Sequence, residues 1–188
     1  NMNEPKIVGF FLIMGSVVFS LIMTALNSLA SNAISREGKH FQFMKYIPIP
    51  YDTQWDIKIL ISCVFSFVGI WMYLLPFCIL IHTNFIYIIV SILLSILSIT
   101  FVSYMGIYID SIQPKLIWDD ELSVLRENTN VALVMALALG IGIAIAFVGY
   151  SFYAFLKVRL LLVSLSLFVV LAILNLFVLW RTSKNAVR

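Results

Sequence analysis

Five long apolar stretches constrain the fold of this 188-residue sequence more than any other feature. A helix rises about 1.5 Å per residue, so about 20 consecutive apolar residues can cross the hydrocarbon core of a membrane, which is about 30 Å thick. The stretches that reach this length are approximately residues 7–33, 57–81, 85–109, 131–155 and 158–180. The sequence therefore predicts an all-α fold, a polytopic bundle of about five transmembrane helices.

The composition agrees with a membrane protein and excludes some partners. Hydrophobic residues make up 62% of the chain and charged residues 11%, whereas about a quarter of the residues of a soluble domain are charged. The formal net charge is only +3, and no dense run of Lys and Arg could follow a phosphate backbone, which argues against nucleic acid as a partner. Because there is no internal repeat and no low-complexity linker, we predict a single transmembrane domain over residues 1–188.

Two polar segments interrupt the apolar stretches, the first polar segment at residues 34–56 and the second polar segment at residues 110–130. In the first, α-helical spacing would place four side chains on one face: His40, Phe43, Met44 and Ile47. Pro48 and Pro50 would end this helix and stiffen the hinge into the next span. Physical chemistry alone allows such a helix either to lie on lipid headgroups or to dock a protein partner.

Two further helix starts are predicted within the polar segments. Thr53-Gln54-Trp55-Asp56 fits a Thr-x-x-Asp capping box, so the helix of the second span is expected to begin there. In the second polar segment, the acidic run Asp119-Asp120-Glu121 leads into a short helix predicted over residues 121–127. Its acidic side chains would complement the positive end of that helix.

The distribution of Lys and Arg predicts the orientation, because these residues are retained on the cytoplasmic side of a membrane. Five alternating spans would put both polar segments and the C-terminus on one side. That side holds nine of the 12 basic residues, which are Arg36, Lys39, Lys45, Lys58, Lys115, Arg126, Arg181, Lys184 and Arg188. We therefore expect a multi-pass protein of the plasma membrane with both polar segments and the C-terminus in the cytoplasm.

No motif in the sequence predicts a metal site or a catalytic centre. Glu37-x-x-His40 has the spacing of half a di-iron site, but no second Glu-x-x-His pair occurs. The acidic run from Asp119 to Glu121 could hold a cation, although we favour the interpretation that it caps the helix that follows. We therefore predict neither a metal ligand nor a catalytic residue.

Nucleotide binding by this chain is not predicted either. The stretch from Gly140 to Ala146 looks superficially like a dinucleotide fingerprint, but it lies within an apolar span and lacks the strand and the acid. A small-residue packing face through Ala138, Gly142 and Ala146 explains it better. There is no Gly-x-x-x-x-Gly-Lys-Ser/Thr loop, so the chain is expected to use no cofactor and to hydrolyse no nucleotide. The spans also lack charged residues at mid-depth, which argues against an ion-coupled carrier.

Two motifs, one in each polar segment, resemble a known family. The first is Ser35-Arg36-Glu37-Gly38-Lys39-x-Phe41-x-x-x-Lys45-x-x-Pro48-Ile49, and the second is Ile109-Asp110-x-x-x-Pro114-Lys115-Leu116-x-Trp118-x-x-Glu121. In the same order, they resemble patterns found in bacterial permease subunits of ABC exporters of the second type. Such permeases usually carry more than five spans, so the resemblance implies a shortened homologue or the C-terminal part of a longer permease.

This resemblance implies that the chain is the permease subunit of an ATP-driven exporter whose ATPase is a separate cytoplasmic chain. It favours the docking role for the first polar segment, and the residues expected to contact the ATPase are Arg36, Glu37, Lys39, Phe41, Phe43 and Lys45. The motif residues of the second polar segment are Asp110, Pro114, Lys115, Trp118 and Glu121. The other implied partners are the lipid bilayer and a second permease subunit, or a second copy of this chain.

Two other classes of protein are also compatible with the sequence. A membrane enzyme acting on lipid would need titratable groups near one interface, and only the acidic run from Asp119 to Glu121, together with His40, could supply them. A non-transporting anchor or immunity-type protein would need only a stable bundle and a surface for its partner.

Overall fold

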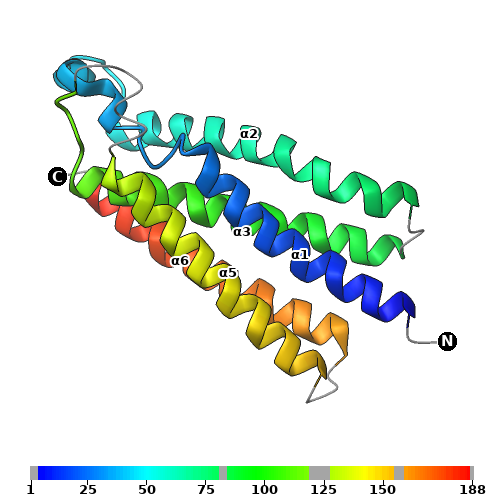
Figure 1. The fold of residues 1–188 in the computed structure, drawn as a ribbon. Helices are drawn as coiled ribbons and strands as arrows, with labels where there is room; N and C mark the ends of the chain where they lie inside the picture. The colour runs from blue at the N-terminus through cyan, green and yellow to red at the C-terminus, as the bar shows by residue number, and fades with distance from the viewer. Residues whose placement is uncertain (1–3, 81–83, 119–127, 155–158, 187–188) are drawn as a thin grey trace.

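The structure, a computed structural model, describes residues 4–80, 84–118, 128–154 and 159–186 (Figure 1). Its elements are α1 (Glu4–Asn27), the 3₁₀-helix η1 (Ser35–Lys45), α2 (Tyr51–Leu80), α3 (Phe85–Ile112), α5 (Thr129–Ala154) and α6 (Leu160–Ala186). All five α-helices among these described residues are long and apolar enough to cross a membrane. The prediction of an all-α bundle with five apolar helices is therefore confirmed, and the chain is a multi-pass membrane protein.

Helices α1 and α3 form the inner pair of the bundle. They pack most extensively on each other, and α1 also packs on α2 and α5 while α3 packs on α6 and α2. The other three helices lie around this pair, with η1 and the C-terminus at one end of the bundle and the N-terminus at the other (Figure 1). We call these the η1 end and the N-terminal end.

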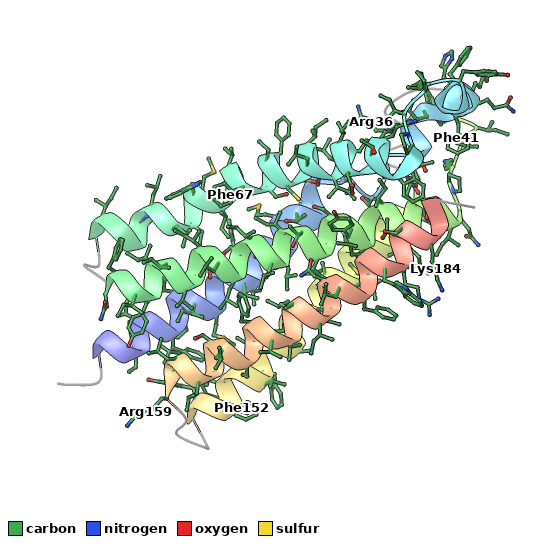
Figure 2. All side chains as sticks on the ribbon, turned by 180° about the vertical axis from the view of Figure 1, so that it is seen from behind. Arg36, Phe41, Phe67, Phe152, Arg159 and Lys184 are labelled. Atoms are coloured by element: carbon green, nitrogen blue, oxygen red, sulfur yellow. The ribbon has the colours of Figure 1, made fainter. Side chains whose placement is uncertain are left out.

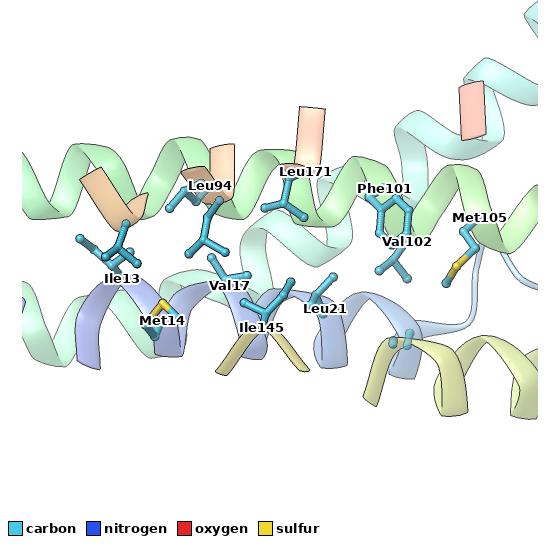
Figure 3. Close-up of a cluster of buried hydrophobic side chains, with 14 of the residues drawn as sticks. Ile13, Met14, Val17, Leu21, Leu94, Phe101, Val102, Met105, Ile145 and Leu171 are labelled. Atoms are coloured by element: carbon cyan, nitrogen blue, oxygen red, sulfur yellow. The ribbon is translucent and has the colours of Figure 1, made fainter. Parts of the chain in front are cut away.

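The core follows from the helical spacing of apolar residues in α1. Ile13, Val17 and Leu21 recur every fourth residue and are completely buried, so they form one stripe along α1. This stripe packs against α3, α5 and α6 within one cluster of buried side chains, which includes Leu94 and Leu171 (Figure 3). A narrow apolar stripe on α1 therefore joins four of the five helices.

Small polar residues are buried in both α1 and α3. The buried hydroxyl residues of the two helices are Ser16, Ser20, Thr24, Ser91, Ser95, Ser98 and Ser103. Most of them satisfy their hydroxyl within their own helix; Ser20, for example, donates to the carbonyl of Val17 at 2.8 Å. Small residues with satisfied polar atoms are typical of close helix contacts in membranes.

The predicted small-residue face of α5 packs on α1. Ala138 and Gly142 are buried, and a Cβ added to Gly142 would lie 3.6 Å from Val18 and 3.9 Å from Leu21. These are ordinary contact distances, so this face lies directly against α1.

The first apolar helix ends earlier than residue 33, where the sequence placed the end of the first span. It ends at Asn27, whose Oδ1 accepts from the backbone N–H of Leu29 at 3.1 Å. Ser28 then adopts a left-handed conformation with φ of 51°, which stops the helix. The Asn27 side chain also donates to Ser66 of α2 at 2.5 Å, so a contact between helices fixes this end.

The predicted capping box at Thr53 is wrong, because α2 already begins at Tyr51. The backbone N–H of Gln54 donates to the carbonyl of Pro50 at 3.2 Å, which places Thr53 inside the first turn. Pro50 is well suited to a helix start because it has no N–H that needs a partner there.

The remaining boundaries differ by a few residues. Helix α3 extends to Ile112 rather than to residue 109, and α6 extends to Ala186 rather than to residue 180. The short helix predicted over residues 121–127 lies outside the described residues, as does the connection at 155–158.

Candidate functional site

Asp110, near the C-terminal end of α3, is completely buried at the η1 end of the bundle. Its carboxylate accepts from the backbone N–H groups of Ile34 (2.7 Å) and Ser35 (2.9 Å), from the Ser35 hydroxyl, and from the side-chain amide of Asn130 (3.0 Å). A buried carboxylate is costly unless hydrogen bonds replace its hydration, and four donors do so here. Asp110 therefore joins α3 to the segment before η1 and to the first turn of α5.

Ser35 is the point where the two sequence motifs meet. Its hydroxyl donates to Asp110 and accepts from the backbone N–H of Lys115 at 2.9 Å. Its backbone carbonyl accepts from the indole N–H of Trp118 at 3.1 Å. One residue of the first motif thus contacts three residues of the second, across more than seventy positions of sequence.

Gly38 interrupts η1 and packs against the same tryptophan. It has φ of 50° and ψ of −127°, a backbone conformation that favours glycine. A Cβ at this position would lie 2.9 Å from atoms of the Trp118 ring. Both the backbone conformation and the close approach therefore require glycine at this motif position.

The predicted amphipathic α-helix of the first polar segment is instead a 3₁₀-helix broken at Gly38. With about three residues per turn, side chains three apart lie above one another. His40 and Phe43 accordingly have ring centroids 5.7 Å apart, and Phe43 and Tyr46 follow at 6.4 Å. His40 and Phe43 are both exposed, while Phe41 is half-buried.

Two of the six predicted docking residues hold η1 on the bundle. The carboxylate of Glu37 pairs with the ammonium of Lys58 on α2 at 2.5 Å, and Lys58 also donates to the carbonyl of Ala33 at 2.8 Å. Phe41 packs against a small buried cluster that includes Ile34 and Trp55. Glu37 and Phe41 therefore anchor the segment to α2 rather than facing away from the bundle.

Three other predicted docking residues face away from the bundle. Arg36 and Lys39 are exposed, and Phe43 exposes 62% of its surface. Tyr46, which exposes 81%, continues the same surface. We call Arg36, Lys39, Phe43 and Tyr46 the η1 surface; Figure 2 shows Arg36 and Phe41 at this end. The side chain of Lys45 lies outside the described residues.

The two hinge prolines lie between η1 and α2. Pro48 and Pro50 are exposed, and a tight turn between them has the N–H of Ile49 donating to the carbonyl of Ile47 at 2.8 Å. The side chain of Gln54 donates to the carbonyl of Ile49 at 2.8 Å. The turn is therefore fixed both by its own backbone and by the first turn of α2.

The second polar segment is described only in part. Pro114 is half-buried, while Lys115 and Trp118 bind Ser35 as described above, and Glu121 lies outside the described residues. Asp119 and Asp120, which the lipid-enzyme alternative requires, also lie outside them. Within the described part of the chain, no group of three His, Cys, Asp or Glu residues could hold a metal ion.

Asn130 is the site residue that sequence reasoning missed. Its side-chain amide donates to Asp110 and to the carbonyl of Gln113 at 2.8 Å, which ties the start of α5 to the end of α3. Its backbone N–H donates to the side chain of Asn128 at 3.0 Å, a typical helix cap. The pair Asn128-x-Asn130 at the edge of an apolar stretch was the available signal, but its partners are far away in sequence.

Comparisons of the chain with known protein families, with curated proteins and with solved structures gave no match. The structure itself defines the class, an all-helical bundle whose five long helices suit a membrane. Its polar junction at the η1 end can fix a backbone segment and present two cations and two aromatic rings to a partner. Such a surface fits an acidic protein surface with apolar pockets.

Proposed function

We propose that this chain is the transmembrane permease subunit of an ATP-driven ABC exporter. In this proposal, the η1 surface docks a separate cytoplasmic ATPase subunit, which carries the ATP hydrolysis. The η1 end then faces the cytoplasm and the bundle lies in the plasma membrane. A second permease subunit, or a second copy of this chain, completes the transporter.

The observation that carries the proposal is the contact between the two motifs. The resemblance to exporter permeases rests on sequence patterns that lie in separate polar segments. In the structure, Ser35 and Gly38 of the first motif contact Asp110 and Trp118 of the second. The motif positions thus have a shared physical role, which is to hold η1 at one end of the bundle.

The same contacts offer a route for mechanical coupling. A force on η1 would reach α3 through Asp110, α5 through Asn130 and α2 through the Glu37–Lys58 pair. Since α1 and α3 are the inner pair, motion of α3 would involve the whole bundle. Rigid-body movement of packed helices is a common way in which such proteins change state.

Charge reversal on the η1 surface tests the proposal. The tagged chain would be co-expressed with an ABC ATPase subunit from the same organism and purified in a mild detergent. We expect R36E/K39E to lower the recovered ATPase at least tenfold, because both cations face away from the bundle and can pair with acidic groups.

The matched control is R159E, which reverses an exposed arginine at the N-terminal end of the bundle (Figure 2). This variant should retain the ATPase as the wild type does. Equal recovery with wild type and with R36E/K39E would contradict the proposed docking surface. Equal losses in R36E/K39E and R159E would point to a general effect of charge and would also contradict it.

A further inference from the structure

The last turns of α6 carry an exposed cluster of aromatic and basic side chains. Its members are Phe177, Trp180, Arg181 and Lys184, spaced so that they share one face of the helix. All four are exposed, and Lys184 lies at the same end of the bundle as Arg36 (Figure 2). We call these four residues the α6 cluster.

Buried residues fix the direction in which the α6 cluster points. Leu171, Val178 and Thr182 lie on the opposite face of α6 and are buried against the bundle. The hydroxyl of Thr182 donates to the carbonyl of Val178 at 2.8 Å, so its polar atom is satisfied within the helix. The α6 cluster therefore faces away from the bundle, where lipid would surround a spanning helix.

Both cations of the cluster lie over the same indole. The guanidinium of Arg181 is 5.3 Å from the centre of the Trp180 ring and 5.4 Å from that of Phe177. The ammonium of Lys184 is 4.1 Å from the centre of the Trp180 ring. These cation–π contacts keep both cations within 5.3 Å of the centre of one indole ring, which limits how far apart they can lie.

The cluster lacks a counter-charge from the described part of the chain. Within residues 4–80, 84–118, 128–154 and 159–186, no carboxylate forms an ion pair with Arg181 or Lys184. An aromatic ring orients a cation but carries no net charge, and it leaves N–H donors of both groups free for an anion. The described residues thus leave both cations available to an anion.

We propose that the α6 cluster binds the phosphate headgroup of an anionic phospholipid in the leaflet at the η1 end. The cluster lies at the end of an apolar span that reaches Lys184, which is the depth of lipid headgroups. Tryptophan prefers this depth, and Arg and Lys there attract anionic lipid. Arg181 and Lys184 bind the phosphate, and Trp180 holds them in place. This inference is independent of the proposed transport function.

Lipid-dependent stability of the purified chain tests the lipid site. In a non-ionic detergent, we expect palmitoyl-oleoyl phosphatidylglycerol to raise the thermal unfolding midpoint by several degrees more than palmitoyl-oleoyl phosphatidylcholine. R181Q/K184Q should lose more than half of this difference, whereas R159Q, just before the other end of α6, should keep it. Inorganic phosphate at the same concentration should give no shift, which separates a lipid from a free anion.

A second measurement does not depend on stability. Native mass spectrometry should show wild type and the charge-conserving R181K/K184R retaining phosphatidylglycerol, and R181Q/K184Q retaining less. Equal retention by wild type and R181Q/K184Q would overturn the proposal. A phosphatidylcholine shift equal to that of phosphatidylglycerol, or an equal shift with inorganic phosphate, would overturn it too.

Discussion

The two ends of the bundle are held together by different kinds of contact. At the η1 end, a buried carboxylate and an ion pair connect α2, α3 and α5 to the segment around η1. At the N-terminal end, aromatic rings connect the helices: Phe10 stacks on Tyr153 with centroids 4.7 Å apart, and Phe19 stacks on Tyr73 at 5.2 Å. One end thus depends on directional polar contacts, and the other on apolar packing.

This difference indicates how each end should respond to change. A hydrogen bond requires particular atoms at particular angles, so removing one partner at the η1 end leaves the others unpaired. Aromatic packing is less directional and can adapt to a lost group. The η1 end is therefore suited to fix a segment in one position, and substitutions there should be the more damaging.

The largest effect is expected for Asp110→Leu. This change removes the carboxylate that accepts hydrogen bonds from Ile34, Ser35 and Asn130. It keeps the volume of the side chain roughly the same. A buried donor left unpaired costs about 1–3 kcal/mol, so a total loss of roughly 3–5 kcal/mol is expected after partial relaxation. The free energy of unfolding, measured by denaturant titration in mixed micelles, would give this value.

Asp56→Ala is the matched control for the loss of an acid. Asp56 is exposed and accepts only from the hydroxyl of Tyr104, at 3.3 Å, among the described contacts. Its removal should change the free energy of unfolding by about 0.5 kcal/mol. A loss for Asp110→Leu no greater than that for Asp56→Ala would show that the buried cluster does not hold the η1 end.

Gly38→Ala should have the next largest effect. The added Cβ would meet the Trp118 ring at 2.9 Å, and alanine would also be strained at φ of 50°. We expect a loss of roughly 2–3 kcal/mol in the free energy of unfolding. Limited proteolysis between η1 and α2 should become faster as well, because η1 would be displaced.

Gly69→Ala provides the opposite case on α2. Apart from its chain neighbours and the nearby backbone of α2, no atom lies within 4 Å of a Cβ built at Gly69, and alanine favours a helix over glycine by about 1 kcal/mol. This variant should be as stable as the wild type or more so. Similar losses at Gly38 and Gly69 would mean that the motif glycine has no special conformational role.

The sequence predicted the five apolar helices well because their length and composition are local properties. It did not predict the end of α1, since Asn27 and its contact with Ser66 of α2 depend on how helices meet. It also assigned the first polar segment the wrong helical period. The segment is a 3₁₀-helix broken at Gly38, where the backbone lies close to Trp118, eighty positions away.

The candidate site was predicted as two motifs and not as one junction. The two motifs included Asp110 and Ser35. The spacing of residues within a motif does not show which groups form hydrogen bonds between residues 75 positions apart. The sequence likewise did not show which charged residue of this segment is paired. Glu37 pairs with Lys58, whereas Arg36 is exposed. The roles of these residues depend on tertiary contacts.

The smallest effects come from removing one hydroxyl at each end, which compares the two ends directly. Ser35→Ala removes the hydroxyl that accepts from the N–H of Lys115 and donates to Asp110, so a loss of about 1–2 kcal/mol is expected. Tyr73→Phe removes a donor to the carbonyl of Phe11 at 2.9 Å but keeps the ring on Phe19, so about 0.5 kcal/mol is expected. Both values come from the same denaturant titration. If Tyr73→Phe costs as much as Ser35→Ala, directional polar contacts are equally important at both ends, and the contrast between them does not hold.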